Sequence, residues 1–147
     1  SLAGKVIDIH RFLNEQGIGA KLAALPPREK KVRVTYHDPC HLRNQGITKE
    51  PREILRALPG VDFVEMRNAD QCCGLGGTFS VYHYDMSVKI GAKKAAAIRD
   101  SGTEVVATAC PGCMMQLLDS INHAGLAHRV CHVLELVAAE LPPANQK

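Results

Sequence analysis

The chain has 147 residues, 46% of them hydrophobic and 22% charged, which is the balance of a folded domain and argues against disorder. The net charge of +3 is small and only the run at 28–33 is densely basic, so nucleic-acid binding is not expected. No apolar stretch is long enough to span a membrane and the N-terminus does not resemble a signal peptide, which predicts a cytoplasmic protein.

Residues 1–147 are expected to form a single domain, because a chain of this length can bury a core without disulfides. The chain starts at Ser1 and enters a helical pattern at once. We therefore expect this domain to be cut from a longer polypeptide.

Helices and strands are expected to alternate along the chain, as judged from hydrophobic periodicity and from the prolines and glycines that bound the periodic segments. In chain order they are a helix over 4–14, a strand over 32–37, a helix over 51–58, a strand over 61–66, a helix over 86–100, a strand over 104–109, a helix over 111–124, a short strand over 128–130 and a helix over 134–141. This alternation predicts an α/β fold, a parallel sheet of about four strands with helices on its faces.

The cysteines follow the predicted strands. Cys40 comes after the first strand, Cys72 and Cys73 come after the second, and Cys110 comes directly after the third. Because ligands of such sheets bind beyond the carboxyl ends of the strands, we expect these thiols to converge at that edge. Cys113 joins them, since it falls in the first turn of the following helix and completes a C-x-x-C pair.

The number of converging thiols reduces the set of metal or redox sites that the cysteines could form. C-x-x-C alone is typical of zinc sites, redox disulfides and iron–sulfur clusters alike. Five thiolates exceed the four that a structural zinc needs and the two that a redox disulfide needs, which favours a multi-iron cluster. In the segment "CCGLGG" (72–77), Gly74 allows a sharp turn after the adjacent cysteines, while Gly76 and Gly77 let the backbone approach a bulky cluster.

The strings "HDPCHL" (37–42), "CCGLGG" (72–77) and "ACPGC" (109–113) resemble the cysteine-rich CCG domain of heterodisulfide reductase. The same domain occurs in iron–sulfur subunits of glycolate oxidase, lactate-utilisation systems and anaerobic glycerol-3-phosphate dehydrogenase. The resemblance extends from Val32 to the last predicted helix, and the flanking residues are most similar to the lactate and glycolate branch.

The resemblance implies a cofactor and a role. The ligands of a 4Fe–4S cluster, non-cubane as in heterodisulfide reductase, would be Cys40, Cys72, Cys73, Cys110 and Cys113. The domain would be an electron-transfer module of an oxidoreductase, would take electrons from a flavin subunit, and would work beside other iron–sulfur domains without catalysing alone. Because family members usually carry two such motifs, this chain would be the C-terminal part of a larger subunit, peripheral to the membrane through its partners.

Two other functions remain open at this point. One is a zinc-stabilised module that docks a partner without redox activity, and the other is a disulfide-reducing site that uses Cys110 and Cys113. The structural alternative is a set of buried small side chains, which the clustering after strands disfavours. The "GLGG" segment lacks the spacing and the lysine of nucleotide-binding loops.

The remaining polar and sulfur-containing residues receive weaker assignments. Cys131 is expected in the core rather than at the site. His37 and His41 flank Cys40 and are weaker candidates for hydrogen bonding to the cluster sulfurs. Met114 and Met115 are expected to pack against the sheet. Surface positions are expected for four histidines: His10, His83, His123 and His128.

Overall fold

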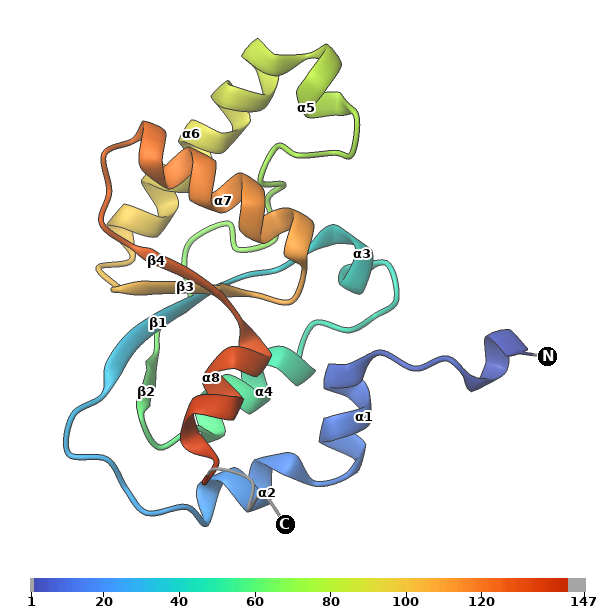
Figure 1. Ribbon diagram of the computed structural model, residues 1–147, viewed down its shortest axis with the longest axis vertical. Helices are drawn as coiled ribbons and strands as arrows, with labels where there is room; N and C mark the ends of the chain where they lie inside the picture. Colours follow the sequence, from blue (N-terminus) through green and yellow to red (C-terminus); the bar gives the residue numbers. More distant parts are fainter. Residues whose placement is uncertain (1, 143–147) are drawn as a thin grey trace.

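A computed structural model describes residues 2–142, in which helices and strands alternate (Figure 1). Its elements are η1 (Leu2–Lys5), α1 (Ile9–Glu15), α2 (Ile18–Ala23), β1 (Val32–His37), α3 (Cys40–Arg43), α4 (Glu50–Ala57), β2 (Val61–Phe63), α5 (Phe79–Tyr82), α6 (Tyr84–Asp100), β3 (Val105–Thr108), α7 (Pro111–His123), β4 (Arg129–His132) and α8 (Val133–Glu140).

The four strands form one parallel sheet in the order β2-β1-β3-β4. In the central pair, Val34 of β1 lies opposite Val105 of β3, and His37 lies opposite Thr108. Because every strand runs in the same direction, all carboxyl ends meet at one edge. The predicted α/β class and the parallel sheet with helices on its faces are confirmed.

The helices form a layer on each side of the sheet, with α6 and α7 on one face and α1, α2, α4 and α8 on the other (Figure 1). The alternation of side chains along β3 divides the core accordingly, because Val105 and Ala107 belong to the cluster under α4 and α8, whereas Val106 packs under α6 and α7. The molecule is thus a three-layer α/β/α arrangement.

Proline starts two of the helices next to the sheet. Pro111 occupies the first turn of α7 and Pro51 the first turn of α4, where a missing N–H costs no helical hydrogen bond. Cys110 is the N-cap residue of α7, so the end of β3 leads into the C-x-x-C segment with only Ala109 between. The sequence therefore fixes both thiols at a strand-to-helix turn.

Several predicted boundaries differ from the structure. The helix expected over 4–14 is two elements, η1 and α1, and neither α2 nor α5 was expected. The second strand ends at Phe63 rather than at residue 66, because Met66 leaves the sheet and is buried in the cluster under α6 and α7.

Three side-chain predictions differ from the structure. His10 is buried, because its ring packs 5.4 Å from that of His132 and its Nδ1 lies 3.0 Å from an Asp8 oxygen. Met115 is 70% exposed, because the stripe of α7 that faces the sheet carries Leu117 and Ile121 instead. His128 is half-buried rather than exposed, while His83 and His123 lie at the surface as expected.

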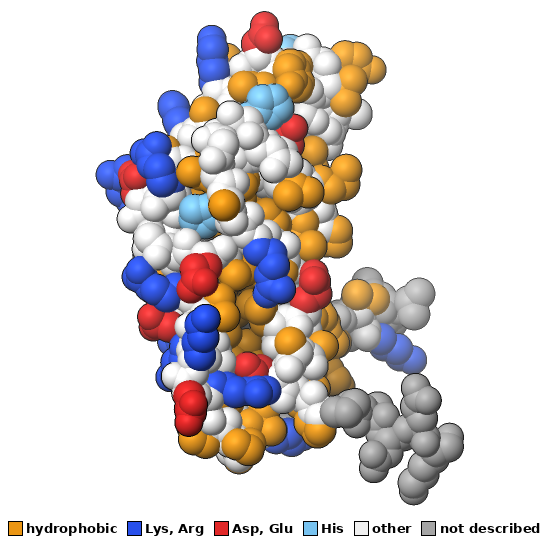
Figure 2. All heavy atoms as spheres, turned by 60° about the vertical axis from the view of Figure 1, so that its left-hand side comes forward, with side chains coloured by type: hydrophobic (Ala, Val, Ile, Leu, Met, Phe, Trp, Pro, Cys, Tyr) orange, Lys and Arg blue, Asp and Glu red, His pale blue; other side chains and the backbone are white. Residues whose placement is uncertain are grey.

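The surface has no concentrated charge on the face in Figure 2, where Lys and Arg side chains are interspersed with Asp and Glu. Among the described residues, no helix combines the length and the apolar character that crossing a bilayer requires.

Candidate metal centre at the carboxyl edge of the sheet

One pocket of about 180 Å³ at the carboxyl edge of the sheet contains all five cysteines of the predicted set. Cys40 and Cys113 are 73 positions apart in the chain and line the same pocket. The lining residues are His37, Cys40, His41, Cys72, Cys73, Leu75, Gly76, Gly77, Cys110 and Cys113. The expected convergence of these thiols is therefore present, and their role as ligands stays a prediction.

Three segments deliver the thiols. Cys40 is the first residue of α3, just after the end of β1. After β3, Cys110 is the N-cap residue of α7 and Cys113 lies in the first turn of that helix. Cys72 and Cys73 lie in the long loop between β2 and α5, nine residues beyond the strand. The adjacent cysteines thus reach the edge through a loop that crosses to the α6 and α7 side.

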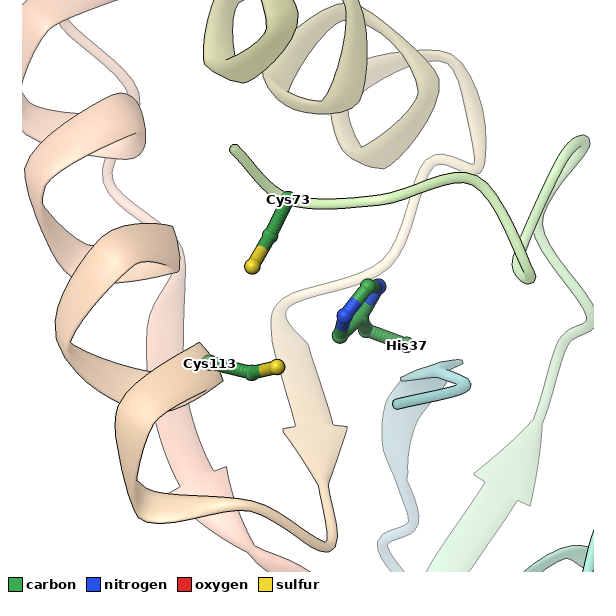
Figure 3. Close-up of side chains that lie close together, drawn as sticks. All are labelled: His37, Cys73 and Cys113. Atoms are coloured by element: carbon green, nitrogen blue, oxygen red, sulfur yellow. The ribbon is translucent and has the colours of Figure 1, made fainter. Parts of the chain in front are cut away.

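His37, Cys73 and Cys113 form the buried floor of the pocket. The side-chain nitrogen of His37 and the two sulfurs all lie within 4.8 Å of one another. Figure 3 shows the three side chains pointing toward one another from the end of β1, the loop and α7. The Nδ1 atom of His37 is buried and has no hydrogen-bond partner among the described residues. Sequence reasoning ranked His37 with His41, and the structure separates them, because His41 is exposed.

The remaining thiols lie nearer the mouth. Cys40 and Cys72 are exposed and Cys110 is partly buried. None of the six cysteines, all within the described part of the chain, forms a disulfide. The pocket therefore has a buried floor and an accessible rim, and thiols contribute to both.

The two buried thiols shift each other's pKa in opposite directions. A hydrogen bond from Cys113, assisted by His37 and by the Leu75 N–H, holds the pKa of Cys73 well below its usual range. The same contact, together with burial, raises the pKa of Cys113. The pair therefore titrates as a unit, and the lowered pKa of Cys73 favours its thiolate, the form that binds metals.

The glycine after the paired cysteines is required by its geometry. Gly74 has a φ of +105°, and a Cβ there would lie 2.8 Å from the backbone oxygen of Ser87. Its carbonyl accepts a hydrogen bond of 2.9 Å from the Ser87 hydroxyl, and its N–H donates to the Cys72 sulfur at 3.3 Å. Gly74 therefore shapes the turn behind the pocket, while Gly77 (φ +60°) lines the pocket itself.

A partly buried ion pair holds the segment around Cys40. Arg52 donates 2.9 Å to the Asp38 carboxylate, and its other nitrogens bind Glu65 at 2.8 and 2.9 Å. The Asp38 N–H donates to the Ala69 carbonyl at 3.0 Å, which links the end of β1 to the loop of the paired cysteines. These contacts hold two of the cysteine segments together without using a thiol.

Cys131 lies on the other face of the sheet. It is part of β4, 1% exposed, and packs in the cluster under α4 and α8, whereas Cys73 and Cys113 pack under α6 and α7. Burial raises the pKa of its thiol to about 11, so it stays protonated at neutral pH. The prediction that Cys131 is a core residue is confirmed.

Some residues of the site were missed by sequence reasoning. Leu75 lines the pocket and packs against the C-x-x-C turn, where a Cβ at Gly112 would come within 2.9 Å of the Leu75 side chain. Ser87 and Lys94 of α6 donate hydrogen bonds to backbone carbonyls of the loop that carries Cys72 and Cys73. A signal for Lys94 exists, because positions 87, 91, 94 and 98 recur at the spacing of a buried helix stripe.

The donor set fits a soft metal. Thiols and imidazoles line the pocket, and no carboxylate of the described residues does. Thiolates and imidazole suit zinc and iron–sulfur clusters, whereas magnesium and calcium require oxygen ligands. The residues present are therefore compatible with either of the two centres that the sequence left open.

Comparison with known proteins gives three similar relatives. One subunit of the fumarate reductase (CoM/CoB) of Methanothermobacter marburgensis is 41% identical over 90% of this chain and 26% of its own length. The probable glycolate oxidase iron-sulfur subunit of Bacillus subtilis is 40% identical over 71% of this chain and 24% of its own. One subunit of the dihydromethanophenazine:CoB–CoM heterodisulfide reductase of Methanosarcina barkeri is 34% identical over 93% and 34%, respectively. This chain thus spans about a quarter to a third of the length of these relatives.

A family model described as a cysteine-rich domain (CCG) matches residues 34–118, which is more than half of the chain. The match includes the five cysteines of the pocket and excludes Cys131. On this evidence the protein belongs to the family of the cysteine-rich CCG domain.

Proposed function

We propose that the chain binds one iron–sulfur cluster through Cys40, Cys72, Cys73, Cys110 and Cys113 and serves as an electron-transfer module of an oxidoreductase. The observation that carries the proposal is the convergence of five thiols, from three separate segments, on one pocket. The names of two similar proteins support it, one an iron-sulfur subunit of glycolate oxidase and the other a component of heterodisulfide reductase.

The cluster would be of the 4Fe–4S type and non-cubane, as the resemblance to heterodisulfide reductase implies, and the five cysteines of the pocket are one more than an ordinary cubane cluster uses. When bound, such a cluster accepts and releases single electrons. The chain itself would supply thiolates, the N–H of Gly74 directed at the Cys72 sulfur, and a floor of buried side chains that keeps water from the inner sulfurs. Hydrogen bonds to sulfur and the exclusion of water both tune the reduction potential.

The electrons would come from a flavin-containing subunit that oxidises lactate, glycolate or a similar substrate, and would pass to a membrane or soluble acceptor. Other iron–sulfur domains would be further partners. The exposure of Cys40 and Cys72 supports this role, because the rim of the pocket is open to a partner. The six unpaired cysteines favour a cytoplasmic setting, where thiols stay reduced. We also propose that this single domain is one part of a larger subunit, as the greater length of the relatives suggests.

The second candidate is a zinc-stabilised docking module, which His37 favours. The imidazole and the sulfurs of Cys73 and Cys113 already lie within 4.8 Å of one another, and one further thiolate would complete a tetrahedral site. Such a site would leave two of the five thiols unused.

Anaerobic purification and reconstitution with iron and sulfide separates the candidates. The cluster proposal predicts brown protein with about four iron and four acid-labile sulfide per chain. Colourless protein that holds one zinc per chain and takes up no iron would support the docking module instead. A Cys110–Cys113 disulfide that cycles in metal-free protein would support the disulfide-reducing alternative.

A further inference from the structure

Lys94 occupies a core position of α6. Its side chain is fully buried at 0% exposure, in the same helix stripe as Ser87, Gly91 and Ile98. Buried lysines are rare unless a partner compensates the charge. The neighbouring Lys93, one position earlier, is exposed and shows the usual placement.

The ammonium group of Lys94 binds the loop that carries the paired cysteines. Its Nζ donates to the carbonyls of Asn68 at 2.6 Å and Ala69 at 3.3 Å. Asn68 has a φ of +55°, a left-handed backbone conformation that residues other than glycine seldom adopt. The Ala69 carbonyl also accepts the Asp38 N–H, so Lys94 reaches the contact that joins β1 to the loop.

The charge of Lys94 has no carboxylate partner among the described residues. Its two acceptors are neutral carbonyls, and the nearby Asp70 pairs with Arg43 at 3.4 Å. Burial lowers the pKa of Lys94 to about 8, and Coulombic interactions with Cys73, Asp70, Cys72 and Cys113 oppose that shift. The ionised forms of the pocket thiols therefore favour the positive charge of Lys94.

We propose that Lys94 is a positioning residue of the metal centre, whose buried positive charge holds the loop of Cys72 and Cys73 in place and stabilises the more negative, reduced form of the bound cluster. The part that concerns reduction rests on the proposed function. The part that concerns the loop does not, because the contacts to Asn68 and Ala69 are present in the protein alone.

The effect of Lys94 on reduction is electrostatic. Reduction adds one negative charge to a centre in a partly buried pocket, where charges interact more strongly than in water. A fixed cation nearby lowers the free energy of the reduced form and raises the reduction potential. Loss of the cation therefore shifts the potential downward.

Two substitutions separate the contact from the charge. Lys94→Met removes both, whereas Lys94→Gln keeps an N–H donor for the loop and removes only the charge. Lys93→Met and Lys93→Gln are the matched controls, because they make the same changes one position away at the exposed surface. Two quantities are measured: the midpoint potential of the reconstituted protein by dithionite titration followed by electron paramagnetic resonance, and amide hydrogen exchange over 68–73 in metal-free protein.

Both Lys94 variants are expected to disfavour the reduced form at least tenfold, a shift of about 59 mV for a one-electron couple. Lys94→Met is expected to speed exchange over 68–73 at least tenfold, and Lys94→Gln to speed it less. The Lys93 variants are expected to match the wild type in both measurements.

A folded Lys94→Gln protein with the wild-type potential would overturn the electrostatic role, and unchanged exchange in Lys94→Met would overturn the role in holding the loop. If Lys94→Met does not fold, the midpoint potential of Lys94→Gln tests the electrostatic role. Its amide exchange over 68–73, expected to be faster than in the wild type, tests the role in holding the loop. A wild-type chain that takes up no iron would contradict the proposed function. In that case exchange, together with the cobalt(II) affinity of the metal-free thiols, still tests Lys94, with at least a tenfold loss expected for Lys94→Met.

Discussion

Cys72 and Cys73 are adjacent in the chain but differ in burial, because the backbone turns at Gly74. Cys73 is buried beside His37 and Cys113, while Cys72 is exposed and accepts the N–H of Gly74. The left-handed conformation of Gly74 makes this division, because the chain reverses immediately after the pair. Both thiols then line one pocket although successive residues of a regular strand would point to opposite sides.

Substitution of Cys73 tests whether the buried thiol is a ligand. Cys73→Ala is expected to lower the iron content of the reconstituted protein by more than half, because it removes the buried thiol whose lowered pKa favours the metal-binding thiolate form. Cys131→Ala is the matched control, since Cys131 is also buried but lies on the other face of the sheet. Iron and sulfide analysis checks both, and equal iron content in the two variants would exclude Cys73 as a ligand.

Substitution of Gly74 tests the turn. Gly74→Ala is expected to lower the free energy of unfolding by about 2 kcal/mol or more, because it adds a clash with the Ser87 carbonyl to the cost of a left-handed φ. Gly125→Ala has the left-handed φ without any neighbour within 4 Å, so about 1 kcal/mol is expected there. Denaturant unfolding measures both, and equal losses would show that the contact with Ser87 is unimportant.

At the scale of elements, the site depends on where three strands end and on what supports the segments beyond them. The parallel register brings the ends of β1 and β3 together, and α6 supports the loop at Ser87 and Lys94. On the opposite face, α4 contributes Arg52, whose guanidinium group pairs with both Asp38 and Glu65. Two of the three cysteine segments, those of Cys40 and of Cys72 and Cys73, are thus held by contacts outside the pocket.

Removal of Arg52 tests that support. Arg52→Met is expected to cost about 3 kcal/mol in the free energy of unfolding, because the Asp38 carboxylate, which is 4% exposed, would be left unpaired. Arg56→Met, one turn further along α4 and over the ring of Phe63, is the control and is expected to cost less than about 1 kcal/mol. Thermal or denaturant unfolding of the two variants gives the comparison, and similar losses would contradict the assigned role of Arg52.

The sequence predicted a strand well where hydrophobic and polar residues alternate strongly. It predicted the site well where a cysteine closely follows a strand. Val32, Val34 and Tyr36 defined β1, and the thiols after β1 and β3 met as expected. Helix propensity does not distinguish Lys93 from Lys94 in "KKAAA", and only the recurrence of positions 87, 91, 94 and 98 indicates that Lys94 lies on the buried stripe of α6. The carbonyl partners of its ammonium group could not be predicted, because they depend on tertiary packing against the loop. The different depths of Cys72 and Cys73 likewise depend on a tertiary turn.

At the scale of the whole molecule, the sheet separates two hydrophobic clusters, of which only one contains cysteines of the pocket. The cluster under α6 and α7 includes Cys73 and Cys113 and forms the floor of the pocket, whereas the cluster under α4 and α8 is larger and contains no pocket cysteine. The helices α1 and α2 add to the second cluster, and His10 of α1 contacts His132 at the start of α8. The stability of the fold therefore rests largely on the face away from the site.

The pH dependence of stability tests the burial of His10. Burial lowers the pKa of His10 below 6.5 despite the opposing effect of Asp8, so the unfolded chain binds a proton more readily than the folded protein. The free energy of unfolding is expected to be highest above pH 6.5 and to fall as the pH drops from 6.5 to the lower folded pKa. His10→Gln is expected to flatten this part of the profile, whereas His123→Gln at the exposed end of α7 is not. If the free energy of unfolding depended on pH in the same way in both variants, a group other than His10 would cause the loss of stability below pH 6.5.

Anomalous diffraction at the iron absorption edge, from crystals of the anaerobically reconstituted protein, would locate the metal relative to the cysteines. We predict iron inside the pocket at the carboxyl edge of the sheet, in contact with the five sulfurs that line it. A single zinc on the buried floor formed by His37, Cys73 and Cys113, or iron bound without the adjacent cysteines, would contradict the five-thiolate cluster.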